Sequence, residues 1–453
     1  MLCSSQFNAT LEKLMSDHGA ALYHSHIDRR QRQTEHALSE LGYDALLIHS
    51  GRADLRFLDD QGPAFRAHAP FVSWVPQPFA EDSLLEVRVG QKPRLWFLQP
   101  DDFWHFPPDP PADWWAGAFD IRVCRRAEEW HESFSATRAF AVIARPGDLD
   151  RIIGGGDLNP DALVQRLNED RTRKTDWESQ CIEKANQLGV RGHRAAADCF
   201  RSGGSELEIH LAYLAAVELD QSEMPYNSIV CLNDHAAILH YQHRSPHRPS
   251  DRYSFLIDAG AQCHGYASDI TRTWAADTGG EFAEMIEAMD EAQQRLVDQT
   301  RAGQSFVELH RETQLAVAGV LEQFGIVAMS PQAMVESGVS GYFMPHGLGH
   351  FLGVQVHDVA GKVSPEGKPM PPPEAYPALR LTRDLQPDNV VTIEPGLYFI
   401  PSLLERLKDS QEGRAVNWQR VDALSIYGGI RIEDNVVVTD DAPRNLTRAA
   451  WAD

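Results

Sequence analysis

Apolar runs and amphipathic stretches alternate in the first third of the chain. Residues 27–42 are polar with the spacing of a helix, and three short apolar runs follow. An apolar run of about four to eight residues between turn residues is typical of a buried strand. The three runs are DALLIH at 44–49, RLWFL at 94–98 and AFAVIA at 139–144. The pattern predicts an α/β domain that ends near the glycines at 154–156.

Hydroxyl residues that are followed three positions later by glutamate mark helix starts in the rest of the chain. In such a capping box, the two side chains satisfy free N–H groups of the first helical turn. The boxes begin at Thr175, Ser205 and Ser305, and they predict helices over 176–201, to about Leu219 and to about Phe324. β-rich stretches lie at 227–241, 253–274, 389–399 and 428–439. Because no regular βαβ rhythm appears, we expect an α+β domain around a mostly antiparallel sheet.

Length and charge narrow the class of protein. The 453 residues exceed what one hydrophobic core usually organises, so we expect two domains, at 1–160 and 161–453. Asp and Glu total 65 against 42 Lys and Arg, which gives a formal net charge of −23. An acidic surface repels nucleic acids and anionic membranes, so we expect neither as a partner.

Cysteine usage and hydropathy indicate a cytoplasmic location. None of the six cysteines has CxxC spacing or a Cys/His zinc pattern, which is typical of free thiols in a reducing compartment. Residues 1–20 lack the basic start and apolar core of a signal peptide. No apolar run reaches the roughly 18–20 residues that a membrane helix needs.

Two aspartates flank a glycine-containing turn in the second half. Asp258 ends the apolar run FLID, Asp269 opens DITRT, and Gly260 to Gly265 connect the two. A hairpin would bring both carboxylates together. A lone aspartate is more often a solvated surface group, but an unpaired carboxylate after a buried run would cost several kcal/mol. A metal ion or a cationic partner would remove that cost.

Three histidines share one glycine-rich segment. His346, His350 and His357 lie within MPHGLGHFLGVQVHD, whose glycines argue against a stable helix and allow close approach to a ligand. A single histidine is usually a satisfied core residue, whereas three in such a segment favour a site.

Two further glutamates end or interrupt apolar β-like runs. Glu394 follows VTI, and Glu433 lies in GGIRIEDNVVV, where Arg431 shares its strand face. A structural ion pair between Arg431 and Glu433 is the simplest alternative to a site. Together the segments supply four carboxylates and one imidazole in probable strands. Oxygen ligands with an imidazole suit Mn²⁺, and also Co²⁺, Fe²⁺ or Zn²⁺, and the excess of carboxylates over one ion favours two ions.

The set resembles the metallopeptidases of the pita-bread fold, which include methionine aminopeptidase, aminopeptidase P and prolidase. The ligand order D…D…H…E…E occurs with the expected neighbours, and further segments are similar to the bacterial Xaa-Pro dipeptidase branch. These segments are 44–51 (DALLIHSG), 57–60 (FLDD), 225–242 (PYNSIVCLNDHAAILHYQ), 344–360 (MPHGLGHFLGVQVHDVA) and 389–400 (NVVTIEPGLYFI). The resemblance covers essentially the whole chain. It implies a pita-bread catalytic domain after a smaller α/β creatinase-like N-terminal domain.

The resemblance also implies a role for each motif residue. The metal ligands would be Asp258, Asp269, His350, Glu394 and Glu433, with Asp269 and Glu433 bridging two ions. Glu394 would also shuttle the proton. His240, His346 and His357 would line the substrate cavity, with His357 steadying the tetrahedral intermediate, Arg431 supporting the cavity and Arg380 anchoring the substrate carboxylate.

The implied activity is hydrolysis of dipeptides ending in proline, by a hydroxide that bridges two metal ions. The nearest alternative is aminopeptidase P, which acts on longer Xaa-Pro peptides, and promiscuous organophosphate triester hydrolysis is a related side activity. A non-catalytic binding protein of the same fold is the alternative from another class, and metal-free creatinase-like hydrolysis fits the ligand set poorly. The family implies a homodimer. Asp44 is the N-terminal residue considered for the cavity.

Overall fold

The computed structural model describes residues 17–104, 111, 114–126, 128–131, 139–148 and 156–452. The chain divides into two compact units between Gln180 and Cys181. This division falls inside the long helix α6 (Asp176–Arg201). Most of the glycine run at 154–156, where we expected the first domain to end, lies outside the described residues.

The N-terminal unit is built on a mixed sheet with the strand order β4-β3-β2-β1-β5-β6. Its strands are β1 (Ala45–His49), β2 (Leu84–Arg88), β3 (Arg94–Leu98), β4 (Asp120–Cys124), β5 (Phe140–Ile143) and β6 (Asp157–Leu158). Strand β1 pairs antiparallel with β2 and parallel with β5. The three apolar runs predicted as strands are β1, β3 and β5. All five residues of β1 are buried, as its continuous apolar run requires.

Helices cover this sheet and complete the predicted α/β domain. They are α2 (Asp17–Leu41), α3 (Ala69–Val72), α4 (Glu128–His131) and α5 (Asp161–Thr172), with a 3₁₀ turn η1 (Ala116–Ala118). The helix predicted over 27–42 therefore begins ten residues earlier than expected. Its inner face buries Tyr23, Ile27 and Leu38. Packing against the core of the unit therefore stabilises the first turns of the helix, where the sequence shows no periodic apolar pattern.

The C-terminal unit has antiparallel pairing in every strand ladder of its described residues, as predicted. Its strands are β7 (Ile229–Leu232), β8 (Ser254–Asp258), β9 (Gln262–Cys263), β10 (Tyr266–Ala267), β11 (Thr271–Ala275), β12 (Val390–Ile393), β13 (Gly396–Tyr398), β14 (Gly429–Arg431), β15 (Asp434–Val437) and β16 (Arg444–Asn445). One β-rich prediction needs correction. After β7, residues 233–237 form a 3₁₀ helix, η3 (Asn233–Ala237), because Asn233 has a positive φ of 58° that ends the strand.

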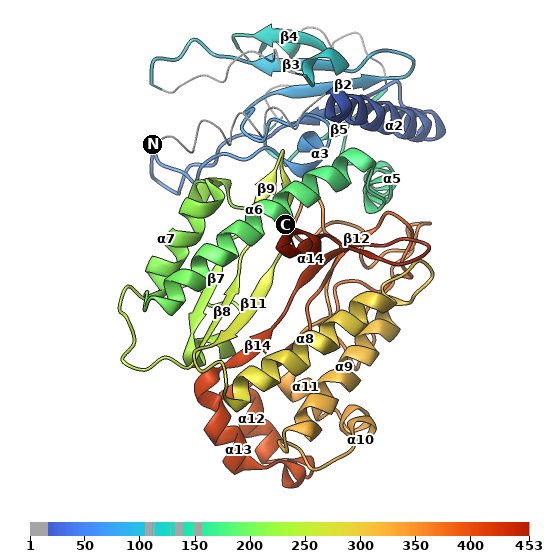
Figure 1. Cartoon of the computed structure of the whole chain (residues 1–453). Coiled ribbons are helices and arrows are strands. Elements are labelled where there is room, and N and C mark those ends of the chain that lie inside the picture. Colours follow the sequence, from blue (N-terminus) through green and yellow to red (C-terminus); the bar gives the residue numbers. More distant parts are fainter. Residues whose placement is uncertain are drawn as a thin grey trace. The chain divides into compact units, whose positions relative to one another are not determined.

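Helices flank these strands, as Figure 1 shows for α6 and α7 on one side and α8 and α9 on the other. Besides α6 they are α7 (Glu206–Val217), α8 (Glu281–Gln299), α9 (Phe306–Gln323), α10 (Pro331–Glu336), α11 (Ser340–Phe343), α12 (Pro401–Lys408), α13 (Trp418–Leu424) and α14 (Leu446–Ala452). Short 3₁₀ turns are η2 (Gln221–Glu223), η4 (Glu412–Ala415) and η5 (Ser425–Tyr427). Within the described residues, no helix has both the length and the apolarity to cross a membrane.

Two of the three predicted capping boxes are present. Thr175 and Glu178 exchange hydrogen bonds at the start of α6, and Ser205 does so with Glu208 at the start of α7. The box at Ser305 is wrong, because its side chain makes no capping bond. Ser305 instead forms an antiparallel bridge with Asp384, and this tertiary pairing fixes the entry into α9.

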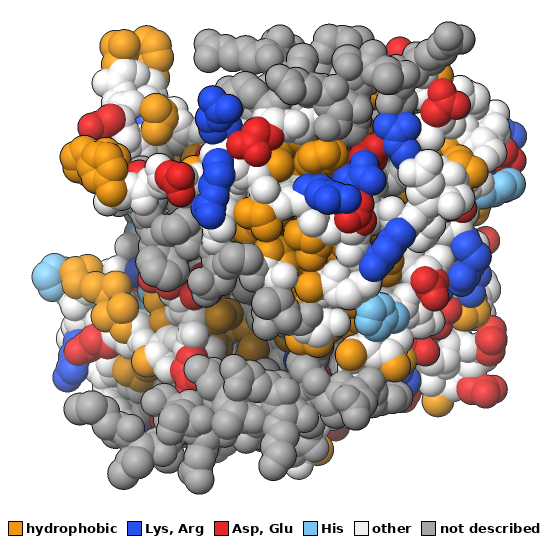
Figure 2. Space-filling model, turned by 90° about the horizontal axis from the view of Figure 1, so that it is seen from above, with side chains coloured by type: hydrophobic (Ala, Val, Ile, Leu, Met, Phe, Trp, Pro, Cys, Tyr) orange, Lys and Arg blue, Asp and Glu red, His pale blue; other side chains and the backbone are white. Residues whose placement is uncertain are grey.

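Charges of both signs are interspersed over the face of the molecule drawn in Figure 2. The excess of acidic residues is therefore not gathered into one block on that face.

Candidate metal centre

Asp258 and Asp269 lie close together, as the predicted hairpin requires. Strands β8 and β11 pair antiparallel, with Asp258 opposite Thr271. The hydroxyl oxygen of Tyr226 lies 2.8 Å from Oδ1 of Asp258 and 2.6 Å from Oδ1 of Asp269. A phenol has one proton, so it can donate to only one of these carboxylates at a time.

His350 faces the same carboxylates through one defined ring nitrogen. Its Nε2 lies 3.4 Å from Oδ2 of Asp269 and 3.8 Å from Oε1 of Glu394. Its Nδ1 lies 2.9 Å from the carbonyl oxygen of Phe351. When Nδ1 donates to that carbonyl, Nε2 is left for a cation, which is the arrangement usual for metal-binding histidines.

Glu433 completes the cluster. It lies between β14 and β15 and forms an antiparallel bridge with Thr271, whose hydroxyl donates to Oε2 at 2.6 Å. Ligand atoms of Asp269, His350 and Glu433 lie within 4.8 Å of one another, and all three residues are buried. The donor set of buried carboxylates and one imidazole fits a divalent cation.

The local setting of the predicted metal ligands differs from the prediction that they lie in strands. Asp258 ends β8, whereas Asp269 precedes β11, Glu394 follows β12, and Glu433 separates β14 from β15. Side chains within a strand alternate between its two faces. Residues at the end of a strand or between two strands do not have to follow this alternation. Several carboxylates can therefore turn toward one point.

Close backbone packing around the cluster explains two of the glycines. A Cβ atom on Gly349 would lie 2.0 Å from the carbonyl oxygen of Thr392, and one on Gly260 would lie 1.9 Å from that of Ser268. The glycine next to His350 therefore lets the histidine segment lie directly against β12. The sequence predicted close approach to a ligand, whereas the glycine is required here by close approach to the backbone of β12.

Burial and mutual repulsion disfavour the ionised forms of the carboxyl groups in the cluster. Burial, together with the charge of Asp269, raises the pKa of Glu394 to about 8 and raises the pKa of Glu433 well above its usual value. Burial also raises the pKa of Asp258, although the Arg431 guanidinium opposes this shift. Divalent cations at this position would stabilise the ionised carboxylates.

Arg431 has a different partner from the one considered from the sequence. Its Nη2 donates to Oδ2 of Asp258 at 2.8 Å and its Nη1 to the hydroxyl of Tyr398 at 3.0 Å. The alternative of a simple Arg431–Glu433 ion pair is therefore wrong. The same Tyr398 oxygen lies 2.9 Å from Nε2 of His346.

Sequence reasoning missed Tyr226 and Tyr398 as members of the site. Tyr226 lies in the segment PYNSIV and Tyr398 in EPGLY, both within the segments that carried the family resemblance. Their hydroxyls contact residues 32 to 52 positions away along the chain. No local pattern marks such a contact.

One cavity of about 320 Å³ gathers all the predicted metal ligands and substrate residues, whereas Asp44 is not among the residues that line it. Its lining includes Asp258, Asp269, His350, Glu394 and Glu433, together with His240, His346, His357, Arg380 and Arg431. Burial lowers the pKa of His346 to about 3 and that of His357 to about 4, so both imidazoles are neutral at pH 7. The cavity thus combines an acidic cluster with hydrogen-bonding groups and a guanidinium.

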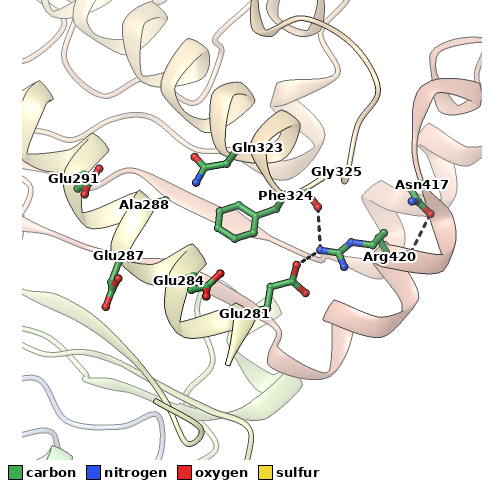
Figure 3. Close-up of a pocket in the computed structure, with 10 residues that line it drawn as sticks. All are labelled: Glu281, Glu284, Glu287, Ala288, Glu291, Gln323, Phe324, Gly325, Asn417 and Arg420. Carbon is green, nitrogen blue, oxygen red and sulfur yellow. Dashed lines mark hydrogen bonds and ion pairs between the residues drawn. The ribbon is translucent and has the colours of Figure 1, made fainter. Parts of the chain in front are cut away.

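A second cavity, of about 800 Å³, contains none of these residues. Figure 3 shows it beside α8, with Glu281, Glu284, Glu287 and Glu291 along the helix. Glu281 pairs with Arg420, which also donates to the carbonyl oxygen of Phe324 at 2.9 Å. This acidic groove has no imidazole in its lining and is not the predicted site.

The two-part fold and the buried cluster of carboxylates and histidine are those of a metallopeptidase, and two family models match the chain. Residues 180–440 match the model of metallopeptidase family M24, and residues 21–168 match the N-terminal domain of Xaa-Pro dipeptidase. The chain belongs to metallopeptidase family M24. The family resemblance and the two-part fold expected from the sequence are confirmed.

Curated relatives place the chain more narrowly, among the Xaa-Pro dipeptidases of that family. It is 45% identical to the Xaa-Pro dipeptidase of Stenotrophomonas maltophilia (strain K279a), over 95% of this chain and 98% of the relative. It is 44% identical to that of Xanthomonas campestris pv. campestris (strain B100), over 96% and 98%. Aminopeptidase P from Escherichia coli with the inhibitor Pro-Leu has the same fold, with a TM-score of 0.71 at 21% identity over 94% of this chain and 95% of that chain.

Proposed function

We propose that the protein hydrolyses Xaa-Pro dipeptides with two divalent cations bound at the acidic cluster. The observation that carries this proposal is the convergence of Asp258, Asp269, His350, Glu394 and Glu433 with Arg380 in one cavity. The high identity to curated Xaa-Pro dipeptidases over nearly the full length supports it. Mn²⁺ suits this oxygen-rich set best among the candidate ions, which also include Co²⁺, Fe²⁺ and Zn²⁺.

Asp258, Asp269, His350, Glu394 and Glu433 would hold the pair of cations, which would supply a hydroxide at neutral pH and polarise the scissile carbonyl. Among the residues of this chain, Glu394 is suited to proton transfer. Its Oε1 lies 3.8 Å from Nε2 of His350 and its Oε2 lies 3.9 Å from Nδ1 of His346, so the carboxylate borders the cluster where it can accept and return a proton. In the proposed reaction Glu394 accepts the proton of the attacking hydroxide. It then delivers this proton to the proline nitrogen, and proline leaves as the free amine when the peptide bond breaks.

Recognition of proline requires groups other than a backbone partner. The peptide bond before proline is a tertiary amide without an N–H, so the enzyme must recognise the ring by shape and the terminal carboxylate by charge. Arg380 is exposed in the cavity and is the proposed carboxylate anchor. His240 and His346 line the cavity, and His357 is the proposed donor to the oxyanion.

The substrate class is tested with matched peptides. We expect Ala-Pro to be cleaved in the presence of Mn²⁺, Ala-Pro-Ala to be cleaved much more slowly, and EDTA to abolish both reactions. Preference for Ala-Pro-Ala would favour aminopeptidase P instead. A phosphotriester in the same assay tests the organophosphate side activity, and absence of metal-dependent turnover of all three compounds would favour a binding protein.

Two variants test the assigned roles. Glu394→Gln should keep bound metal and lose most turnover, and near-normal turnover would exclude the proton shuttle. Arg380→Ala should raise the KM for Ala-Pro, with Arg444→Ala as the matched control at an exposed ion pair. An unchanged KM for Arg380→Ala would exclude Arg380 as the anchor.

A homodimer in the cytoplasm is part of the same proposal. Phe57 and Leu58 are 91% and 90% exposed, and Phe103 and Trp104 are 86% and 78% exposed. Contiguous exposed apolar patches mark surfaces that bind another protein, and we propose that these side chains contribute to the dimer contact. Light scattering on purified protein should give twice the chain mass, and a monomer mass would refute the dimer.

A further inference from the structure

Glu206 is a buried carboxylate outside the metal cluster. It is the first residue of α7, and only 1% of it is exposed. Its two oxygens have four partners, which all lie in one later segment of the chain. Oε1 lies 2.9 Å from the amide nitrogen of Leu232 and 2.6 Å from Nδ1 of His235, and Oε2 lies 2.8 Å from both the Tyr241 hydroxyl and the amide nitrogen of Ser245.

These partners bracket the segment that forms one wall of the substrate cavity. Leu239 and His240 both line that cavity. After η3, residues 238–245 have no helix or strand that would fix their conformation. The carboxylate therefore takes the place of a strand ladder, because it bonds to the segment on both sides of His240.

A carboxylate suits this position better than any neutral side chain. An ionised carboxylate has about four acceptor sites and no proton, and here each oxygen meets two donors. The first turn of a helix also favours a negative charge through its free N–H groups. A glutamine of the same shape would turn an NH₂ group toward two of the four donors.

We propose that Glu206 is a positioning residue that sets the substrate affinity of the enzyme by holding Leu239 and His240 against the bound dipeptide. The proposal rests on the proposed dipeptidase function for its kinetic readout. Glu206 contacts neither the metal ligands nor Arg380 among the hydrogen bonds of the described residues. Its effect should therefore fall on substrate binding rather than on metal binding or proton transfer.

The kinetic test compares Glu206→Gln with Glu208→Gln. Glu208 lies in the same helical turn, caps α7 and pairs with exposed Arg248, so its substitution controls for a lost charge at the helix start. We expect Glu206→Gln to raise the KM for Ala-Pro by about tenfold or more, with kcat within about threefold and metal content unchanged. The control should leave KM unchanged. A fall in kcat with KM unchanged would overturn the proposal.

A double-variant cycle tests whether the effect passes through His240. If Glu206 acts by placing His240, then Glu206→Gln should change KM by less than about twofold in a His240→Ala background. Full additivity of the two changes would show that Glu206 acts elsewhere and would overturn the proposal.

Hydrogen exchange gives a readout that does not depend on activity. In Glu206→Gln, amides of 232–245 should exchange faster while those of α8 and α9 keep their rates, and unchanged exchange in 232–245 would overturn the proposal. If the wild-type protein cleaves no Xaa-Pro dipeptide, the proposed function fails, but exchange still decides whether Glu206 holds this segment.

A milder variant serves if Glu206→Gln does not fold. Tyr241→Phe removes one of the four hydrogen bonds and keeps the buried ring. It should raise KM by about threefold to tenfold and speed exchange in the same segment. A Tyr241→Phe protein with wild-type KM and wild-type exchange would likewise overturn the proposal.

Discussion

Arg431 and Asp258 form a buried ion pair at the edge of the acidic cluster, with Nη2 of the arginine 2.8 Å from Oδ2 of the aspartate. Arg431 is 4% exposed, so water screens this pair weakly. Burial raises the pKa of Asp258, and the guanidinium partly opposes this rise. It therefore helps to keep one proposed metal ligand ionised and fixes its orientation.

Removal of this guanidinium should weaken metal binding. We expect Arg431→Ala to lower the affinity for Mn²⁺ by about 10–100-fold, the usual effect of losing a residue that orients a ligand. Calorimetric titration of metal-free protein with Mn²⁺ measures this change. Arg444→Ala, which removes an exposed ion pair, is the control. Equal affinities for the two variants would contradict the role of Arg431.

Metal binding should stabilise the folded protein. The cluster brings together buried carboxyl groups whose pKa values are raised by burial and by one another, which disfavours the ionised state without cations. Mn²⁺ at about 100 times its dissociation constant should add about 2.7 kcal/mol to the free energy of unfolding. Urea unfolding with Mn²⁺ and with EDTA tests this. The increase should vanish in an Asp269→Asn, Glu433→Gln double variant, and an increase that persists there would place the ion elsewhere.

Stability should fall in acid because of His193, among other buried groups. This histidine is fully buried in α6, with Nε2 2.9 Å from the carbonyl oxygen of Ala259, and burial lowers its pKa to about 3. The unfolded chain takes up this proton at a pKa of about 6.5. Between these two values the unfolded state binds more protons, so the free energy of unfolding falls as pH decreases. The contribution of one such group approaches about 1.4 kcal/mol per pH unit.

The pH dependence can be assigned with two variants. Urea unfolding from about pH 7 to about pH 5 should show a shallower loss of stability in His193→Gln than in the wild-type protein. His243→Gln, at an exposed position, should leave the slope unchanged. Parallel slopes for all three proteins would show that His193 does not titrate in this window.

Gly349 should not accept a side chain. A Cβ atom there would lie 2.0 Å from the carbonyl oxygen of Thr392, a backbone atom that cannot rotate away. We expect Gly349→Ala to cost more than about 2 kcal/mol of unfolding free energy and to displace the neighbouring His350. Gly319→Ala is the control, because nothing lies within 4 Å of its added Cβ in helix α9. The control should stabilise the protein by up to about 1 kcal/mol, and equal stabilities would refute the steric argument.

The sequence by itself determined the features that depend on neighbouring residues. Strand β3 and helix α6 begin and end at the predicted residues, because apolar periodicity and the Thr175 capping box act within one element. The ligand motifs were also visible, since each is a short run with characteristic neighbours. Their convergence followed from the family resemblance, not from local pattern.

Tertiary structure decided the rest, because it depends on which distant segments meet. Ser305 forms a backbone bridge with Asp384 instead of the predicted capping box. Arg431 pairs with Asp258, 173 positions away, and not with Glu433, two positions away. Tyr226 joined the cluster through the folding of β8 and β11 into one sheet. Local sequence sets the conformation of a segment, but a long-range hydrogen bond forms only where packing and burial bring its partners together.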